Sequence, residues 1–286
     1  MAIGDLPTAI SQFMNTKNLN ICIVGCGFMG GKHAEGWSKV DKARIVAVVD
    51  LIEERRQRLA TTYNAKAFSD YRQALTLPEV NVVSVCIPTY LHPEVSLLAL
   101  NGGKNVLCEK PIALTLEQAD EMIDLAVHVF DVWSYIFDSQ PAQVVAQGLT
   151  LAKDRTEIAH IKQKAVDTAT ITVKYESGDV GNFTVTWGLP PTVNPPNYPD
   201  RIFGARGYAE VEFQMAHQSL RVIDESGTAK TVSACDEDMY HREIANFARS
   251  ILHDEPSITS GREGKAALAV SLATLESIRT GKRMKL

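Results

Sequence analysis

A glycine-rich turn between an apolar strand and a helix constrains the fold of this chain more than any other feature. Residues 19–24 form a short run rich in Ile, the pattern of a strand buried in a parallel sheet. The segment that follows matches the G-x-G-x-x-G turn, in which the glycines permit a tight bend, close approach of a diphosphate and close helix packing. It therefore predicts a dinucleotide site at a helix N-terminus, built from Gly25, Gly27, Phe28, Met29 and Gly30.

A second apolar run, "ARIVAVVD", ends in Asp50, twenty positions after Gly30. A carboxylate at this place in a dinucleotide fold accepts hydrogen bonds from the adenosine ribose hydroxyls. Asp50 could instead be a turn residue or a helix cap, but the strand–turn–helix context favours the ribose role. Because a carboxylate would repel a 2′-phosphate, the sequence favours NAD over NADP, although Arg55 and Arg56 lie close by.

Strand-like and helix-like patterns continue to alternate as far as residue 111. Apolar runs at 65–68, 81–88 and 104–111 read as strands, and "HPEVSLLALNGG" has helical periodicity with a glycine stop. This alternation predicts a doubly wound parallel sheet, which binds ligands beyond the carboxyl ends of its strands. The residues expected at that edge are Pro88, Thr89, His92, Glu109 and Lys110.

Lys110 is the candidate for proton chemistry at this edge. It follows a buried strand beside Glu109, facing the nucleotide crevice, where an amine can hold an alcohol or carbonyl oxygen during hydride transfer. Pro88 has an alternative interpretation as a strand stop, and His92 as a residue that starts a helix.

Composition excludes several classes of function. The formal net charge is −5, so nucleic-acid binding has no electrostatic support, and the mixed-charge run at 53–58 reads as a solvated helix face. No apolar run is long enough to span a membrane, and residues 1–18 lack the pattern of a signal peptide. Five cysteines, mostly in apolar runs, indicate reduced core thiols in a cytoplasmic protein, and no metal site is expected.

Several motifs together resemble the glucose–fructose oxidoreductase/inositol dehydrogenase (Gfo/Idh/MocA) family. They are "GCGFMGGKHA", "VVD", "CIPTYLH" and above all "GKNVLCEKPIALT", with further similarity from residue 165 to the C-terminus. The resemblance implies a Rossmann domain, predicted over 1–127, and a shortened C-terminal α/β domain with an open, mainly antiparallel sheet, predicted over 128–286. It also implies NAD(P)-dependent chemistry on sugars, inositols or related polyols, a catalytic lysine at Lys110, an aspartate–histidine pair at Asp124 and His128, and a homo-oligomer.

The second half of the chain supports this architecture from its own patterns. Side chains alternate in "TITVKYE" and "NFTVTW" around the turn "ESGDVG", which predicts an antiparallel hairpin. Helical periodicity appears in "MYHREIANFARSIL" and in "GKAALAVSLATLESIRTG".

The chain departs from the family between Lys110 and Asp124. Family members carry several dozen more residues there, including the sixth Rossmann strand and the first strand and helix of the second domain. Here Thr115 and Gln118 make a capping box, so one helix is expected from about 116 to 137. His128 would lie roughly 18 Å along a straight helix of this kind, too far to reach Lys110. Asp124 and His128 are thus either a helix-surface pair or, given a helix break or a partner subunit, catalytic.

Two functions remain open at this stage. The first is a dehydrogenase in which Lys110 moves the proton and Asp124 and His128 assist. The second is a dinucleotide-binding protein that has lost catalysis and acts as a sensor or partner-binding module. Loss of an edge strand would also leave backbone groups to be covered by another segment or subunit, which favours dimerisation or aggregation.

Overall fold

The computed structural model describes residues 18–112, 130, 132–156, 159, 162, 164–190, 192–193, 200–214, 217–233, 238–258 and 260–286. The chain divides into two compact units. The first unit comprises the chain up to Trp187 together with Tyr240–Leu286, and the second unit comprises Gly188–Met239. The predicted domain boundary between residues 127 and 128 lies outside the described residues and stays a prediction.

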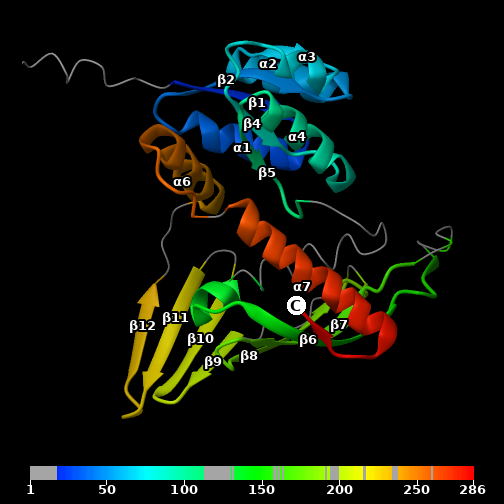
Figure 1. Cartoon of the computed structure of the whole chain (residues 1–286), viewed down its shortest axis with the longest axis vertical. Helices are drawn as coiled ribbons and strands as arrows, with labels where there is room; N and C mark the ends of the chain where they lie inside the picture. Colours follow the sequence, from blue (N-terminus) through cyan, green and yellow to red (C-terminus); the bar gives the residue numbers. More distant parts are fainter. Residues whose placement is uncertain are drawn as a thin grey trace, which may run out of the picture. The chain divides into compact units, whose positions relative to one another are not determined.

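A five-stranded parallel sheet forms the first half of the first unit (Figure 1). Its strand order is β3-β2-β1-β4-β5, with β1 at the centre. The strands are β1 (Leu19–Val24), β2 (Ala43–Val49), β3 (Lys66–Phe68), β4 (Val82–Val85) and β5 (Asn105–Cys108). The helices between them are α1 (Phe28–Ser38), α2 (Glu53–Tyr63), α3 (Tyr71–Leu75) and α4 (His92–Asn101), with the 3₁₀ turn η2 (Thr89–Leu91) before α4. The doubly wound parallel sheet is confirmed.

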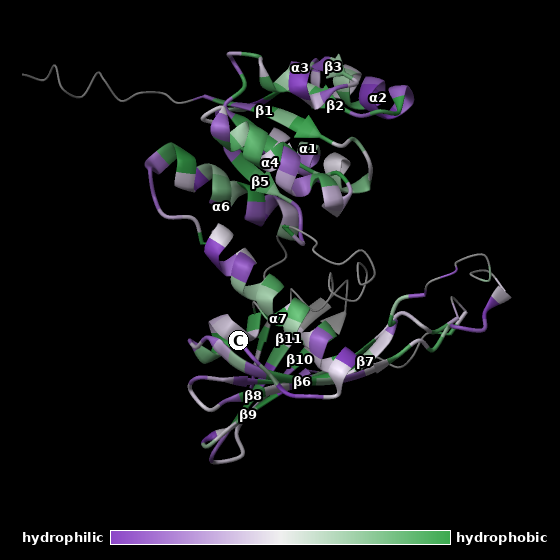
Figure 2. Ribbon diagram, turned by 45° about the vertical axis from the view of Figure 1, so that its right-hand side comes forward, coloured by the Kyte–Doolittle hydropathy of each residue, from purple (hydrophilic) through white to green (hydrophobic). Residues whose placement is uncertain are grey.

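Two apolar cores cover the two faces of this sheet, because successive strand side chains point to opposite sides. On one face Ile21 and Ile23 pack with α1, α2 and α6 (Met239–His253). On the other face Cys22 and Val24 pack with α3 and α4. In Figure 2, α2 is largely hydrophilic in colour, and five of the residues at 53–58 are exposed, which confirms the solvated helix face.

The position of α6 could not be expected from the order of elements along the chain. Ile244 of α6 is fully buried in the same core as Trp37 of α1. Gly36 makes this approach possible, since a Cβ there would lie 2.5 Å from Ile244 Cδ1. A helix that follows the second unit thus completes the core of the parallel sheet.

The antiparallel sheet of the first unit has the order β13-β6-β7-β8. Its strands are β6 (Pro141–Leu149), β7 (Thr168–Tyr175), β8 (Val180–Thr186) and β13 (Met284–Lys285), and α7 (Gly261–Thr280) packs on it. The predicted hairpin corresponds to β7 and β8, and the two predicted helices correspond to α6 and α7. Strand β6 was not predicted, although it alternates buried Val144 and Ala146 with exposed Val145.

A four-stranded antiparallel sheet with the order β12-β11-β10-β9 forms the second unit. Its strands are β9 (Asp200–Gly204), β10 (Gly207–Gln214), β11 (His217–Asp224) and β12 (Ala229–Ser233). An α/β fold with antiparallel strands in the second half of the chain is therefore confirmed.

Only the end of the helix expected at 116–137 can be compared with the structure. Residues 130 and 132–137 are helical, and Asp138 follows with a positive φ of 45°. Thr115, Gln118, Asp124 and His128 lie outside the described residues. Among the described helices, none combines the length and the apolar character needed to cross a membrane.

Candidate functional site

The glycine-rich turn has the local geometry that its sequence predicts. Gly25 has φ +95°, and a Cβ there would lie 2.2 Å from the Cys86 carbonyl oxygen. A Cβ on Gly30 would lie 1.8 Å from the Gly25 carbonyl oxygen, so the first turn of α1 packs directly on the loop. At Gly27, by contrast, a Cβ would meet nothing within 4 Å. The middle glycine therefore leaves open space in front of the helix N-terminus.

Asp50 holds the glycine-rich turn in place from the end of β2. Its Oδ2 accepts a hydrogen bond from the Cys26 amide, and its Oδ1 accepts one from the Ile52 amide, both at 2.8 Å. Arg56 donates to the carbonyl oxygens of Asp50 and Leu51. Each carboxylate oxygen can accept a second hydrogen bond, so the Asp50 carboxylate retains acceptor capacity towards a ribose.

The cysteines near this turn have the properties expected of core thiols. Burial raises the pKa of Cys22 and of Cys26 to about 12, so both are protonated at neutral pH. The four described cysteines are all free. These thiols are therefore poor nucleophiles and poor metal ligands, and the described residues contain no group suited to a metal ion.

The residues predicted beyond β4 and β5 meet at one edge of the parallel sheet. A cavity of about 160 Å³ is lined by Met29, Cys86, Ile87, His92, Glu109 and Lys110. Met29 comes from the glycine-rich turn, and the others follow β4 or β5. Pro88 and Thr89 lie in the same connection, where Pro88 precedes the 3₁₀ turn η2. The structure thus brings the glycine-rich turn and Lys110 to a common cavity.

His92 joins the two loops that line this cavity. Its ring is 1% exposed, with Nε2 at 2.7 Å from the Ile87 carbonyl oxygen and Nδ1 at 2.8 Å from the Pro111 carbonyl oxygen. Both ring nitrogens face backbone carbonyl oxygens, to which a neutral ring donates from one nitrogen and a charged ring from both. We therefore expect His92 to act on the site by holding the Lys110 loop against the end of β4.

A buried polar network behind Lys110 was missed from the sequence. His33, 2% exposed, lies between Ser84 Oγ at 3.3 Å and Glu109 Oε1 at 3.0 Å, and Trp37 Nε1 donates to Ser84 Oγ at 2.8 Å. One signal was available, because a serine inside the apolar strand "VVSVC" needs a hydrogen-bonding partner.

The pKa values of two carboxyl groups near His33 are shifted in opposite directions. Burial acts to raise the pKa of Glu109, but the hydrogen bond and charge of His33, together with Lys110, outweigh it and hold that pKa below its ordinary value. Burial raises the pKa of Glu243, on α6, above its ordinary value, with His33 opposing and Glu109 adding to the shift. Glu109 is therefore ionised at neutral pH, and the same region holds a second carboxyl group whose pKa is shifted in the opposite direction.

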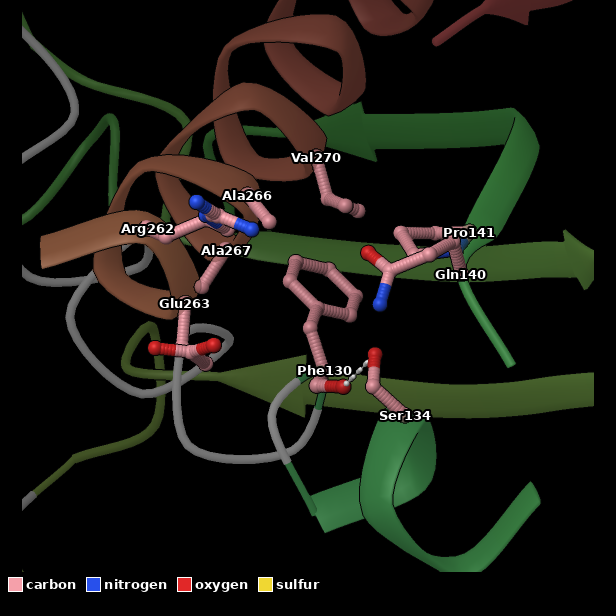
Figure 3. Close-up of a pocket in the computed structure, with 9 residues that line it drawn as sticks. All are labelled: Phe130, Ser134, Gln140, Pro141, Arg262, Glu263, Ala266, Ala267 and Val270. Atoms are coloured by element: carbon pink, nitrogen blue, oxygen red, sulfur yellow. Dashed lines mark hydrogen bonds between the residues drawn. The ribbon is translucent and has the colours of Figure 1, made fainter. Parts of the chain in front are cut away.

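Two further cavities meet at the first turns of α7. One, of about 280 Å³, includes Glu109, Lys110 and Glu243 in its lining. The other, of about 330 Å³, is drawn in Figure 3. Phe130 and Val270 are among its apolar residues, and Ser134, Gln140 and Arg262 are among its polar ones. Glu263 and Ala267 line both cavities. Phe130, two positions after His128, therefore lies beside the helix turns that also border the Lys110 cavity.

Comparison with known proteins identifies the family. Residues 19–134 match the model of an oxidoreductase family with an NAD-binding Rossmann fold, and residues 121–286 match the model of its C-terminal α/β domain. The chain belongs to the Gfo/Idh/MocA oxidoreductase family. The resemblance noted from the sequence motifs is confirmed, and with it an NAD-binding Rossmann fold in the first half of the chain.

Several proteins that resemble this chain are named dehydrogenases. The myo-inositol 2-dehydrogenase of Thermotoga maritima is 23% identical over 341 residues, which covers 94% of this chain and 98% of that protein. The D-glucoside 3-dehydrogenase of Escherichia coli is 39% identical over 126 residues, covering 43% of this chain and 36% of that protein. A levoglucosan dehydrogenase solved with NADH and levoglucosan has a TM-score of 0.78 at 18% identity, covering 94% of this chain and 99% of that one, and shares the fold.

The first of these alignments also bears on the length of the chain. Its 341 positions exceed the 286 residues of this chain, although it covers nearly all of both proteins. The inositol dehydrogenase therefore carries internal residues that this chain lacks. Their predicted place, between Lys110 and Asp124, stays a prediction.

Proposed function

We propose that this protein is an NAD-dependent dehydrogenase that transfers a hydride between the nicotinamide ring and a sugar, an inositol or a related polyol. One observation carries the proposal: Met29 of the glycine-rich turn and Lys110 line the same cavity at the carboxyl edge of the parallel sheet. Ligands of doubly wound sheets bind at this edge.

The residues of the turn fit a dinucleotide. The open space at Gly27 faces the start of α1, where unpaired backbone amides and the helix dipole favour a diphosphate. In this proposal the amides of Gly27, Phe28, Met29 and Gly30 hold the diphosphate, whereas Gly25 contributes the tight bend, since its own amide donates to the Val49 carbonyl oxygen at 2.8 Å. Asp50 accepts hydrogen bonds from the ribose and disfavours a 2′-phosphate, so NAD is preferred to NADP. Pro88, Thr89, His92 and Glu109 border the nicotinamide end.

Lys110 handles the proton in this proposal. Bound NAD supplies an acceptor or donor of hydride at its nicotinamide ring. The Lys110 amine takes the proton of the substrate hydroxyl during oxidation and returns it during reduction, which requires hydrogen-bond contact with that oxygen. Asp124 and His128 assist in binding and orienting the hydroxyl.

The substrate class is inferred from the relatives. Those reported above are named for an inositol, a glucoside and levoglucosan, all of which carry adjacent hydroxyl groups. We also propose a homo-oligomer in the cytoplasm. Among the strands of the described residues, β5 lies at the end of the parallel sheet, and an edge strand presents backbone groups that a neighbour can cover, which supports association. The protonated core thiols suit a reducing compartment.

The proposal is tested by turnover. Sugars and inositols are screened with NAD for absorbance of the reduced cofactor, first with the unmodified protein and then with Lys110→Ala. We expect a loss of turnover of about 10²-fold or more in Lys110→Ala. Lys174→Ala, which removes an exposed lysine from β7, is the matched control. Equal turnover in Lys110→Ala and the control would refute the assigned proton role.

A second candidate function follows from the length of the chain. The residues that this chain lacks relative to the inositol dehydrogenase favour a protein that binds NAD without turnover, as a sensor or partner-binding module. Calorimetric titration with NAD distinguishes the two, because binding without turnover on a broad panel supports the second. Failure to bind NAD or NADP would reject both.

A further inference from the structure

Arg58 belongs to the solvated face of α2, but its side chain contacts the glycine-rich turn. Its Nη2 donates to the Cys26 carbonyl oxygen at 3.3 Å, although the two residues are 32 positions apart in the sequence. The guanidinium also acts on the thiol of Cys26: burial raises the pKa of this thiol to about 12, and the charge of Arg58 opposes that shift. The function proposed above does not involve Arg58.

Cys26 is held through both of its backbone groups. Its amide donates to Asp50 Oδ2 at 2.8 Å, and its carbonyl oxygen accepts the bond from Arg58. Its side chain is fully buried, and the thiol donates to the Val49 carbonyl oxygen at 3.4 Å. Three separate contacts therefore fix the orientation of Cys26 within the turn.

The bond from Arg58 also determines the direction of the next amide. The Cys26–Gly27 peptide bond is trans, and the C=O and N–H of a planar trans peptide point in opposite directions. Because the Cys26 oxygen is directed at Arg58, the Gly27 N–H is directed away from the guanidinium. No acceptor for this N–H lies within the described parts of the chain. The Gly27 amide is therefore oriented towards an acceptor that a ligand can supply.

The charge of Arg58 strengthens the Gly27 amide as a donor. A cation that donates to a carbonyl oxygen polarises the peptide unit, so the N–H of the same unit becomes a better donor. Such an N–H at the start of a helix suits the anionic oxygens of a diphosphate. Arg58 bonds the oxygen at the other side of the peptide, so it acts on the ligand through this amide and not by direct contact.

We propose that Arg58 is a positioning residue for the dinucleotide, because it orients the Cys26–Gly27 peptide so that the Gly27 amide meets the diphosphate. This inference rests on the proposed function in one respect, namely that the ligand of the turn is a dinucleotide. The orientation of the peptide is a property of the free protein. The two can therefore be tested separately.

The orientation is tested in the free protein by nuclear magnetic resonance. The protein, which has 18 glycines, is labelled with ¹⁵N-glycine, and the Gly27 signal is identified by its loss in Gly27→Ala. Arg58→Met keeps the apolar stem of this exposed side chain but removes the donor, so we expect the Gly27 signal to move. The signal of Gly36, inside α1, should stay in place. Arg55→Met, which removes an exposed arginine from the same helix, is the matched control and should leave the Gly27 signal unchanged.

The effect on the ligand is tested by calorimetric titration with NAD and with adenosine, which has the ribose hydroxyls but no diphosphate. We expect Arg58→Met to bind NAD about 3- to 10-fold more weakly than Arg55→Met, because one charge-assisted hydrogen bond is weakened. Adenosine affinity should stay within about twofold. The difference for NAD should persist at about 0.5 M salt, where attraction between exposed charges is largely screened. Arg58→Lys, whose ammonium can make the same single bond, should restore both the Gly27 signal and the NAD affinity to near their original values.

Several results would overturn the inference. The first is an unmoved Gly27 signal in Arg58→Met, which would mean that Arg58 does not orient the peptide. The second is a loss of NAD affinity that Arg55→Met shares or that disappears at high salt, which would assign the effect to net charge. The third is an equal loss of adenosine affinity, which would indicate general loosening of the site. If the unmodified protein binds neither NAD nor NADP, the proposed function fails instead, and the Gly27 signal still decides whether Arg58 orients the turn.

Discussion

Gly27→Ala is the substitution that most directly tests where the dinucleotide binds. Gly27 has φ −73° and ψ −153°, a conformation that alanine adopts without strain, and a Cβ there would meet nothing within 4 Å. The new methyl group therefore fits the folded protein. It would occupy the space through which a diphosphate approaches the start of α1.

The expected changes in stability and binding are of different size. Alanine is a poorer N-cap than glycine by some tenths of a kcal/mol, and this cost is offset by about 0.4–1 kcal/mol from the reduced freedom of the unfolded chain. The free energy of unfolding should thus stay within about 0.5 kcal/mol of its original value. The loss of charge-assisted amide–phosphate bonds costs about 1.5–3 kcal/mol, which weakens NAD binding roughly 10- to 150-fold.

Two measurements on two variants check this expectation. Urea unfolding followed by circular dichroism gives the stability, and calorimetric titration with NAD gives the affinity. Gly31→Ala is the matched control, because a Cβ on Gly31, one turn further along the helix surface, also meets nothing within 4 Å. It should bind NAD as the unmodified protein does. If Gly27→Ala binds NAD with unchanged affinity, the diphosphate does not approach the helix at this position and the proposed site is wrong.

Three further predictions concern Asp50, the contact between α1 and α6, and the loss of folding stability at high pH. Asp50→Asn removes the charge that disfavours a 2′-phosphate, so the preference for NAD over NADP, measured by titration with both, should fall by about 1 kcal/mol, roughly fivefold; an unchanged ratio would argue against the ribose role. Gly36→Ala places a methyl group 2.5 Å from Ile244 Cδ1, so it should lower the free energy of unfolding by about 1–3 kcal/mol. The double variant Gly36→Ala/Ile244→Val should recover part of this loss. If the losses of the two substitutions are instead additive, α6 does not pack at this position. Burial, partly opposed by Ser134, raises the pKa of Tyr175 from 10.0 to about 12, so the stability that this side chain contributes is complete below about pH 10 and is lost as the pH rises towards 12. Urea unfolding across this range should lose less stability in Tyr175→Phe than in the unmodified protein, and equal losses would contradict the assignment.

The sequence alone determined the features that depend on local pattern. The five parallel strands, the glycine-rich turn, the helix at 92–101 and the hairpin of β7 and β8 all follow from apolar periodicity, glycine placement and turn residues within short windows. These signals are local because a strand that is buried on both faces, or a turn that needs a positive φ at Gly25, restricts the residues at those positions themselves. The strand β6 was not predicted because its apolar alternation is short, and only Val144 and Ala146 of this strand are buried.

The tertiary structure decided what depends on residues far apart in the chain. Nothing near Ile244 indicates that it packs against Gly36, and nothing near His33 indicates that its partners are Ser84 and Glu109, 51 and 76 positions away. Such contacts depend on the path of the whole chain, because a helix face or a ring nitrogen accepts many partners and only the fold selects one. Local pattern thus determined the elements and the phosphate-binding turn. The fold determined the surroundings of Lys110, because a carboxylate and an imidazole constrain each other only once folding has buried them together.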